Sequence, residues 1–510
     1  MKNIKLLFCL SIGLLCFTSS AFSKKTPKKP NIILFMVDDM GWQDTSLPFW
    51  TERTHFNDRY QTPNMERLAK QGMKFTQAYA CAVCSPTRVS LMTGMNAAHH
   101  RVTNWTLKKN TMQVNPPKGL KVPKWNMNGI GVDKSLENAI YTPQPLPKVL
   151  QENGYTTIHC GKAHFGAMDT KAADPTHIGF TVNIAGHAAG GPATYYGKDN
   201  FAKKTPSVWD IPGLEEFHGQ DIFLTEALTQ KTLKVVDKTI KEQKPFFLYM
   251  AHYAVHAPIM GDKRFEQKYL DKGLHPIEAK YASLIEGMDK SLGDILDYVE
   301  KEGIAENTIV LFMSDNGGLS AHARGGERHS HNYPLSSGKG SIHEGGIREP
   351  MIVKWPGVVK SNTTCNDYLI IEDFYPTILK MAGLKQLKGA CQPIDGKSFV
   401  SKLKGKKNKD ENRPLYWHYP NNWGPHGPGI STYSAIRKGD WKLIYYYTDS
   451  SFELFNITKD ISEKKNLVEE NKEIAKALAD DLTSYLKKVD AQRPSNAKTG
   501  EIIAWPNEVL

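Results

Sequence analysis

The sequence predicts an α/β fold with a mainly parallel sheet, helices on both faces of that sheet, and a small antiparallel subdomain after it. Two observations support this. Short, unbroken apolar runs, which suit strands buried on both faces, alternate with segments of helical periodicity. Polar residues follow each run at once, as expected at the carboxyl edge of a parallel sheet, where sites form. The 510 residues, 40% of them apolar, suffice for one large domain and a smaller one.

Four apolar runs predict the central strands: Asn31–Val37, Thr156–Cys160, Phe246–Met250 and Thr308–Met313. Helices are predicted between them, over 145–153, 221–240 and 277–301. In the last of these, apolar residues recur at helical spacing and make one face. Strands that alternate with helices favour a parallel sheet covered on both sides.

The pattern changes after about residue 390. A stretch rich in lysine and glycine, 401–409, indicates a linker. Strand-like runs follow at 415–418, 441–447 and 452–455, and a helix is predicted over 472–488. We therefore expect a leader over 1–23, a main domain over 24–400, and a C-terminal subdomain of antiparallel strands and one helix over 401–510.

The first residues are typical of a signal peptide. Lys2 and Lys5 precede the apolar stretch 6–15, which is too short to span a bilayer, and small residues at 21–23 suit a cleavage site. Cys16 follows two leucines, so lipidation is not expected. No later stretch is long and apolar enough to cross a membrane, and we expect an exported protein, either periplasmic or secreted.

The formal net charge of +12 suits an anionic substrate, which a basic protein attracts over long range. The basic runs at 24–29 and 402–409 contain no interleaved aromatic residues and are explained as a tail and a loop. Nucleic acid is therefore not an expected partner.

The cysteine count is odd once the leader is removed. Of the seven cysteines, Cys9 and Cys16 leave with it, and those that remain are Cys81, Cys84, Cys160, Cys365 and Cys391. An odd number in an exported protein indicates one special thiol. Cys365 and Cys391 close a short loop and could pair, while Cys160 ends an apolar run and is as easily explained by the core.

Acidic and amide side chains follow two of the predicted strands. Asp38 and Asp39 come directly after the first, and adjacent carboxylates there cannot both be buried without a cation. Asp315 and Asn316 follow another strand in the same way. Four such oxygen-bearing side chains favour Ca²⁺ or Mg²⁺ over zinc. Either pair alone is equally explained as a solvated turn; the two together at equivalent strand ends favour a metal.

The segment Cys84-Ser-Pro-Thr-Arg88 is the most specific feature. Proline near its start predicts the first turn of a helix. A helix N-terminus favours anions, and Arg88 adds a cation within that turn. The alternative is an ordinary cysteine of low pKa at a helix start. A thiolate, however, is an unusual ligand beside a hard metal site, and an exported thiol is open to oxidation.

These motifs together resemble the formylglycine-dependent (type I) sulfatases of the alkaline-phosphatase-like superfamily, and bacterial polysaccharide sulfatases in particular. Residues 84–88, with Thr93-Gly94 downstream, resemble the signature for oxidation of the cysteine to an aldehyde, formylglycine or 3-oxoalanine. The other matching stretches, in family order, are 31–39 and 314–317 (metal motifs), 161–164 (Gly-Lys-x-His), 256–258 (His-x-Pro), and Lys339 ahead of 344–348 (sulfate-contacting lysine). Ala163 departs from the aromatic residue often found there. The resemblance covers nearly the whole chain after the leader.

The resemblance implies the alkaline-phosphatase-like fold, with catalysis in the domain over 24–400. It implies one Ca²⁺, with Mg²⁺ as the less favoured ion, bound by Asp38, Asp39, Asp315, Asn316 and the modified Cys84. It also implies a maturation partner, either a formylglycine-generating enzyme or an anaerobic sulfatase-maturating enzyme.

The implied roles continue residue by residue. One hydroxyl of the hydrated aldehyde at position 84 attacks sulfur, with Arg88 stabilising its deprotonated form. Lys162, Lys339 and His256 neutralise the sulfate oxygens. His164 takes the proton of the second hydroxyl, so that sulfate is expelled. Either His256 or Lys339 assists the leaving alcohol.

A sulfated oligosaccharide or polysaccharide is the expected substrate, either algal (ulvan or a galactan) or a glycosaminoglycan. Export, a basic chain and aromatic residues on which sugar faces can stack support this expectation; the aromatic residues are Trp42, Trp105, Tyr195, Tyr196 and Trp423. The loops 183–205 and 318–338 could shape the sugar subsite. The candidate substrate-binding residues are His99, His100, His187, Arg324 and His426.

Two other functions compete with this one. A phosphodiesterase or phosphonate hydrolase of the same superfamily would often bind two zinc ions through extra histidines and use Thr or Ser as nucleophile, whereas here the ligands suffice for one metal and the nucleophile is Cys84. A non-catalytic binder of sulfated glycans would result if Cys84 stayed unmodified, but it would not need the complete set of catalytic groups.

Overall fold

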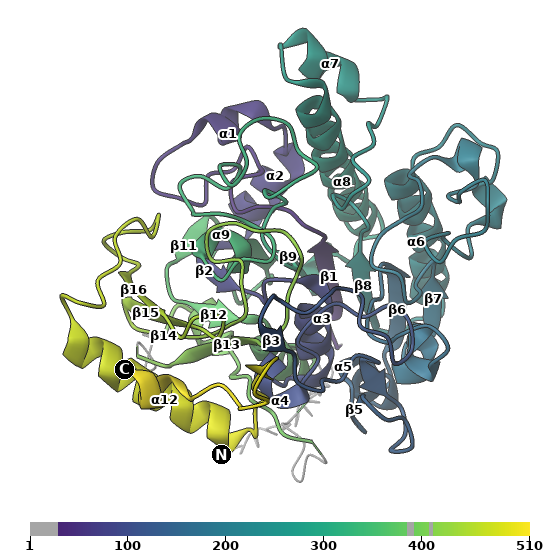
Figure 1. The fold of residues 1–510 in the computed structure, drawn as a ribbon. Coiled ribbons are helices and arrows are strands. Elements are labelled where there is room, and N and C mark those ends of the chain that lie inside the picture. Colours follow the sequence, from purple (N-terminus) through teal and green to yellow (C-terminus); the bar gives the residue numbers. More distant parts are fainter. Residues whose placement is uncertain (1–28, 385–391, 407–411) are drawn as a thin grey trace, which may run out of the picture.

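A computed structural model of the chain describes residues 29–384, 392–406 and 412–510 (Figure 1). Within these residues, nine strands form one sheet in the order β11-β2-β10-β9-β1-β8-β6-β7, with β12 also paired to β2. The strands are β1 (Asn31–Val37), β2 (Met73–Tyr79), β6 (Thr156–Gly161), β7 (Val182–Ile184), β8 (Phe246–Ala251), β9 (Thr308–Ser314), β10 (Arg348–Lys354), β11 (Thr363–Cys365) and β12 (Leu369–Ile370). The four predicted strands are β1, β6, β8 and β9.

The centre of the sheet is parallel, as predicted. β1 lies between β8 and β9 and runs parallel to both, with Val37 beside Ser314 and Met36 beside Ala251. β6 continues the parallel arrangement next to β8. β10 is antiparallel to both of its neighbours, β9 and β2, so the sheet is mixed towards that edge. The carboxyl ends of β1, β6, β8 and β9 therefore share one edge of the sheet.

Both faces of the sheet are buried, which explains the unbroken apolar runs. In β1, Ile32, Leu34 and Met36 belong to one apolar core, and Ile33, Phe35 and Val37 belong to the other. The helices that pack on the first face include α3 (Cys84–Thr93), α5 (Leu146–Glu152) and α10 (Phe374–Met381), and those on the second include α2 (Pro63–Gln71), α6 (Leu224–Lys241) and α8 (Pro276–Lys301). The three helices predicted between the strands are α5, α6 and α8.

Four antiparallel strands and a long helix follow, which confirms the predicted C-terminal architecture. They are β13 (Leu415–Tyr419), β14 (Tyr433–Lys438), β15 (Trp441–Tyr446), β16 (Phe452–Asn456) and α12 (Lys472–Lys488). Ile436 and Leu443 pack under α12. On the other face, Trp417 donates its indole N–H to the carbonyl oxygen of Ala80, at 2.9 Å, shortly before Cys84. The boundary at residue 401 stays a prediction.

Short elements complete the described residues: α1 (His55–Arg59), α4 (Ala97–His100), α7 (Glu266–Asp271), α9 (Glu344–Ile347), α11 (Val400–Leu403), α13 (Pro506–Val509), β3 (Leu120–Lys121), β4 (Ile130–Gly131), β5 (Ile140–Tyr141) and β17 (Ser495–Asn496). α11 occupies the start of the stretch predicted as a linker, because Val400 and Leu403 are buried in the first core. The leader and Cys391, and so the proposed pairing with Cys365, lie outside the described residues. In the part of the chain that the structure describes, no helix has the length and apolar character needed to cross a bilayer.

Candidate active site

The sheet topology brings the polar residues at the strand ends together. Asp38 and Asp39 follow β1, and Asp315 follows β9, the strand that pairs with β1 on one side. The backbone N–H of Asp315 donates to the carbonyl oxygen of Val37 at 3.0 Å, and that of Asp39 donates to Oδ1 of Asp315 at 3.2 Å. Lys162 follows β6 at the same edge of the sheet.

The acidic cluster at this edge contains oxygens that the protein leaves unpaired. Asp38, Asp39, Asp315 and Asn316 are all buried. Asn316 donates from Nδ2 to Oδ1 of Asp39 at 2.8 Å, but its own Oδ1 has no hydrogen-bond partner among the described residues, and neither has Oδ1 of Asp38. Burial, together with the nearby charge of Asp315, raises the pKa of Asp38 well above its usual range. Buried hard oxygens without partners fit a hard cation.

A further carboxyl group, which sequence reasoning missed, lies close to this cluster. Glu349 of β10 is fully buried, and neither carboxyl oxygen has a hydrogen-bond partner within the described residues. Burial and the charges of Asp315 and Asp39 raise the pKa of Glu349 well above its usual range. No feature of the sequence around Glu349 indicated that its side chain would lie beside the acidic cluster.

Three buried cations balance the three buried aspartates. Lys162 Nζ lies 2.6 Å from Oδ2 of Asp38, and Lys339 Nζ lies 2.7 Å from Oδ1 of Asp39. The Arg88 guanidinium donates through Nε to Oδ2 of Asp315, at 2.9 Å. 

Arg88 and Lys339 remain charged. Their acidic neighbours hold the pKa of both side chains above its ordinary value despite burial. The site therefore presents fixed positive charge beside the acidic cluster, which suits an anionic group.

Cys84 is the first residue of α3, the helix predicted from its Pro-Thr-Arg sequence. Its side chain is nearly fully buried, and Val83 precedes the helix in an extended conformation. Thr87 Oγ1 accepts a hydrogen bond from the backbone N–H of Cys81, at 3.0 Å. This bond ties the segment before α3 to the first turn of that helix. Arg88 lies one turn beyond Cys84, so the helix start and this cation approach the same position.

His164 is held as a neutral base. Its Nε2–H donates to the carbonyl oxygen of Thr106 at 2.7 Å, which leaves Nδ1 as the acceptor. That Nδ1 is buried and has no hydrogen-bond partner within the described residues. Burial and the charge of Lys162 lower the pKa of His164 well below its usual range. An unprotonated ring nitrogen inside the site can accept a proton.

His256 has the opposite orientation. Its Nδ1–H donates to the carbonyl oxygen of Ala257 at 2.6 Å, and its Nε2 lies 3.7 Å from Oδ2 of Asp39. Burial and the charge of Lys339 lower the pKa of His256 well below its usual range. Candidate ligand atoms of Asp38, Asp39 and His256 lie within 4.8 Å of one another, so His256 also touches the region where a cation would bind.

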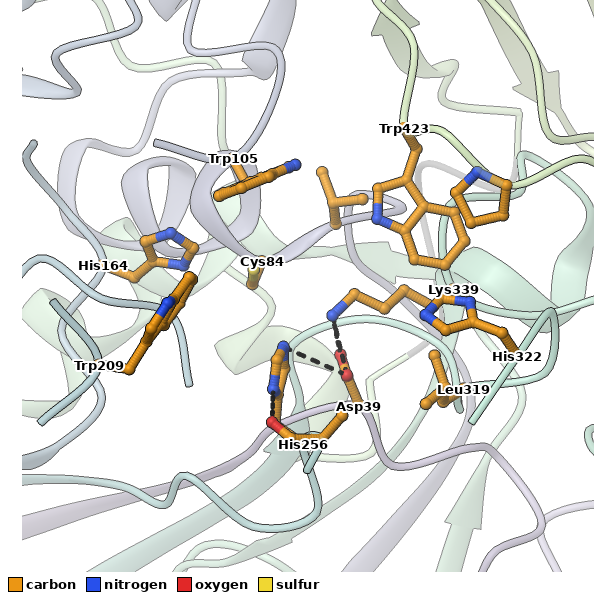
Figure 2. A pocket seen from close by; sticks show the side chains of 14 residues that line it. Asp39, Cys84, Trp105, His164, Trp209, His256, Leu319, His322, Lys339 and Trp423 are labelled. Atoms are coloured by element: carbon orange, nitrogen blue, oxygen red, sulfur yellow. Dashed lines mark hydrogen bonds and ion pairs between the residues drawn. The ribbon is translucent and has the colours of Figure 1, made fainter. Parts of the chain in front are cut away.

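A cavity of about 290 Å³ opens onto these groups (Figure 2). Its reactive lining consists of Asp39, Cys84, His164, His256 and Lys339. The rest of its lining is mostly apolar and includes Trp105, Trp209, Trp423, Leu319 and Pro425. Figure 2 shows Cys84 between the indole rings, with Trp209 close to His164 and Trp423 close to Lys339. The cavity is therefore charged at its base and aromatic around it.

Trp209 and His322 are an aromatic and a titratable lining residue that the sequence analysis did not name. His322 lies in the loop 318–338, which was expected to shape the site, as does Leu319; Gly190 comes from the other such loop. Trp209 lies just beyond that loop and is tied to it, because its carbonyl oxygen accepts from the N–H of Ala193 at 2.7 Å. A lone tryptophan in an irregular segment carries no periodicity that could have revealed its place.

The predicted substrate histidines do not line the cavity. His99 Nδ1 lies 3.0 Å from Asp395, and buried His100 pairs through Nε2 with Ser90. His187 pairs through Nδ1 with the hydroxyl of Tyr253. Burial lowers the pKa of His100 to about 3 and that of His187 to about 4. Each of these contacts is made within the chain, and a substrate contact of these histidines stays a prediction.

Arg324 is also directed inward. Its guanidinium forms buried ion pairs with Asp44 and Glu278, at 3.2 and 2.9 Å, and its side chain is not exposed. A substrate contact is therefore not supported for Arg324. His426 is exposed and follows Pro425, which lines the cavity, so it lies next to the rim without lining it.

The aromatic residues expected to be exposed divide into two groups. Trp105 and Trp423 are partly exposed and line the cavity, as expected. Trp42 and Tyr195 are buried, which corrects the expectation. The ring of Trp42 stacks on the Arg348 guanidinium, 4.4 Å from it, and Tyr195 donates its hydroxyl to the backbone. Tyr196 is partly exposed and bonds to Gly261, outside this cavity.

Comparison with known proteins gives a consistent result. Residues 30–384 match a family model described as "Sulfatase", and residues 337–492 match one described as "N-sulphoglucosamine sulphohydrolase, C-terminal". A "Sulfatase" of Formosa agariphila is 31% identical, over 96% of this chain and 94% of that protein. An "N-acetylgalactosamine-6-sulfatase" of Mus musculus is 30% identical, over 86% of this chain and 76% of that protein.

Among solved structures, "Ps i-CgsB in complex with k-i-k-neocarrahexaose" is similar over 94% of this chain and 96% of its own, with a TM-score of 0.70 and 26% sequence identity. The mostly parallel sheet, the covering helices and the small antiparallel sheet are those of the alkaline-phosphatase-like fold, as the sequence motifs implied.

Proposed function

This chain belongs to the sulfatase family and is a sulfuric ester hydrolase, and on that premise we propose that it removes sulfate from carbohydrates with a formylglycine made from Cys84 and one bound calcium ion. The observation that carries the proposal is the position of Cys84. It begins a buried helix and lines the same cavity as Asp39, His164, His256 and Lys339. An unmodified thiol is a poor partner for this collection of hard oxygens and cations.

The unpaired oxygens support a hard cation. Asp38, Asp39, Asp315, Asn316 and the modified residue 84 would hold it. When bound, calcium withdraws charge from the sulfate group. Calcium suits the site better than Mg²⁺, because Mg²⁺ usually retains several waters, whereas the candidate ligands here are buried.

The remaining catalytic roles belong to residue 84 and to the cationic side chains around it. One hydroxyl of the hydrated aldehyde attacks sulfur, the bond between sulfur and the sugar oxygen breaks, and the sugar alcohol leaves. Deprotonation of the second hydroxyl then expels sulfate and restores the aldehyde. Arg88 places fixed positive charge one turn from that position. Lys162 and Lys339 neutralise sulfate oxygens once the cation shares their carboxylate partners.

His164 receives the proton of the second hydroxyl. Its Nε2–H is committed to Thr106, so Nδ1 is the atom that accepts the proton. The site excludes water around this nitrogen, because His164 is almost completely buried. The role expected of His164 from the sequence is thus supported by its tautomer.

The lining of the cavity supports a sugar substrate. Trp105, Trp209 and Trp423 offer ring faces for stacking. Within the described residues, Asp39 and Lys339 are the acidic and basic residues that line the cavity, and both belong to its reactive base. A sugar carboxylate would find no further cation there. We therefore favour an uncharged sulfated sugar, such as a galactan residue, over the uronic acids of ulvan and many glycosaminoglycans.

Maturation and export complete the proposal. Oxidation of Cys84 requires a formylglycine-generating enzyme or an anaerobic sulfatase-maturating enzyme. The leader over 1–23 would direct the chain to the periplasm or the medium.

The test combines peptide mass with a substrate panel. The chain is co-expressed with a maturating enzyme, its thiols are alkylated, and the tryptic peptide 75–88 is weighed. We expect alkylation at Cys81 and an aldehyde at position 84. Turnover is then compared for a sulfated galactan oligosaccharide, an aryl sulfate and an aryl phosphate, with Cys84→Ala as control. A dominant phosphatase rate, or full activity of Cys84→Ala, would refute the proposal.

A further inference from the structure

A second cavity lies apart from the active site. It has a volume of about 650 Å³, in the range of ligand-binding pockets, and shares no lining residue with the cavity at Cys84. It lies between the loop 42–51, strand β2 with the edge strand β11, and the turn 457–461 that follows β16. Figure 1 shows β2, β11 and β16 on the same side of the molecule.

The charged side chains that line this second cavity are all basic. Lys74, Arg348 and Lys459 line it, and among the described residues no Asp or Glu does. Arg348 already has a partner, because its guanidinium lies 3.3 Å from Glu344. Lys74 donates to the carbonyl oxygen of Pro48, a neutral group. Lys459 is exposed and forms no ion pair within the described part of the chain. Two of the three cations are thus uncompensated by a carboxylate.

Aromatic and polar groups accompany these cations. Trp50 is partly exposed, and its ring meets that of Tyr333 edge-on, 6.3 Å away. The indole N–H of Trp42, which also lines the cavity, is buried without an acceptor among the described residues. Thr364 and Asn366 add exposed polar side chains to the wall.

We propose that this cavity is a second, non-catalytic binding site for a sulfated saccharide, an inference that rests on the proposed function. A sugar ring can stack on Trp50 while its sulfates meet Lys74 and Lys459. A single inorganic anion would satisfy the lysines but would leave most of the volume and Trp50 unused. The ligand class is therefore a short segment of a sulfated chain.

Such a site binds one segment of a polymer while a sulfate ester at the other end of that polymer is hydrolysed in the active site. Binding at the second cavity makes delivery of a chain end to Cys84 intramolecular, which raises the local substrate concentration. The effect depends on a substrate long enough to engage both cavities. It should be absent for a substrate of one sugar.

The binding test uses the full chain carrying Cys84→Ala, so that no turnover occurs. Affinity for κ-carrageenan is measured by affinity electrophoresis and calorimetry with Trp50→Ala or Lys459→Glu added. We expect each to weaken binding by about tenfold, the loss typical of an interface anchor, down to the residual affinity of the active site. Lys476→Glu, at an exposed lysine of α12, is the matched charge control and should bind like its parent.

Activity measurements separate this inference from the proposed function. In the matured enzyme, Trp50→Ala and Lys459→Glu should raise KM for the polymer by about tenfold and leave kcat and KM for a sulfated monosaccharide unchanged. Unchanged polymer binding in both variants, equal binding of desulfated polymer, or full displacement by equimolar inorganic sulfate would overturn the second site. Loss of all sulfatase activity in the parent enzyme would instead overturn the proposed function.

Discussion

Lys162 Nζ and Asp38 Oδ2 lie 2.6 Å apart, and neither side chain is exposed to solvent. Asp38 keeps its second oxygen unpaired within the described residues. The pair therefore serves two purposes in the proposed site: Lys162 opposes the rise in the pKa of Asp38 that burial causes, and it would face the sulfate once a metal bound that carboxylate.

Replacement of this lysine should have an effect that calcium reverses. Lys162→Met leaves Asp38 buried without its hydrogen-bond donor, and the carboxyl group then takes up a proton, so the free energy of unfolding should fall by about 1–3 kcal/mol in chelator. Saturating calcium should restore much of this loss, because the ion takes over the neutralisation and binds the folded state. Denaturant unfolding with EDTA and with calcium measures both values.

An exposed pair of the same length provides the control. Lys241 Nζ also lies 2.6 Å from an aspartate oxygen, that of Asp237, but its side chain is 75% exposed. Lys241→Met should change stability by less than about 1 kcal/mol, with or without calcium. An equal loss for Lys162→Met in both buffers would exclude Asp38 as a calcium ligand.

The pH dependence of turnover should report His164. Its pKa is held well below 6.5 by burial first and by the charge of Lys162 second. A base with a lowered pKa stays unprotonated as the pH falls through 6.5, so kcat at saturating calcium should decline only at clearly lower pH. Lys162→Met removes the second cause and should move the acid limb towards 6.5, whatever its effect on the maximal rate. An acid limb at 6.5 in the parent enzyme, or one that does not move in the variant, would contradict this role.

The close approach of Gly190 to His164 can be tested separately. A methyl group added at Gly190 would lie 2.4 Å from Cε1 of the His164 ring, so the ring must turn away from Thr106. We expect Gly190→Ala to lower kcat by about 10²-fold, the cost of a misplaced catalytic group, to change KM little, and to lower the free energy of unfolding by about 1–3 kcal/mol through overpacking. The double variant with His164→Gln is the control. If Gly190 acts through His164, adding Gly190→Ala to His164→Gln should lower kcat no further. Additive losses of kcat would contradict this.

The polar residues at the carboxyl edge of the sheet could be predicted from sequence because each of them directly follows a strand. Each polar residue there follows an apolar run, and parallel strands end at one edge, so Asp39 and Asp315 had to approach each other although 276 positions separate them. The start of α3 was equally readable from the Pro-Thr-Arg sequence after Cys84. No statement about loops was needed for either prediction.

The sugar subsite was less predictable because loop paths are not encoded in periodicity. Arg324 resembled a binding residue, but its partners Asp44 and Glu278 are distant in sequence and could not be paired with it in advance. His99 also lies outside the cavity, and its partner Asp395 is likewise distant in sequence. Trp209 was missed although its chemistry suits a sugar, since its place in the cavity lining depends on the path of an irregular segment that a backbone hydrogen bond holds to Ala193.

Trp209 provides the sharpest test of the sugar subsite. It is partly exposed, lines the cavity and lies close to His164 (Figure 2), so Trp209→Ala should raise KM for a sulfated galactose by about tenfold as the stacking surface is lost. A small alkyl sulfate has no ring to stack, and its kcat/KM should change little. Trp209→Phe keeps a ring face and should retain most of the affinity. Trp505→Ala is the control, because that partly exposed tryptophan stacks on Arg493, 3.7 Å away, and does not line this cavity. Equal losses for the sugar and the alkyl sulfate would mean that Trp209 supports the catalytic groups and does not bind the sugar.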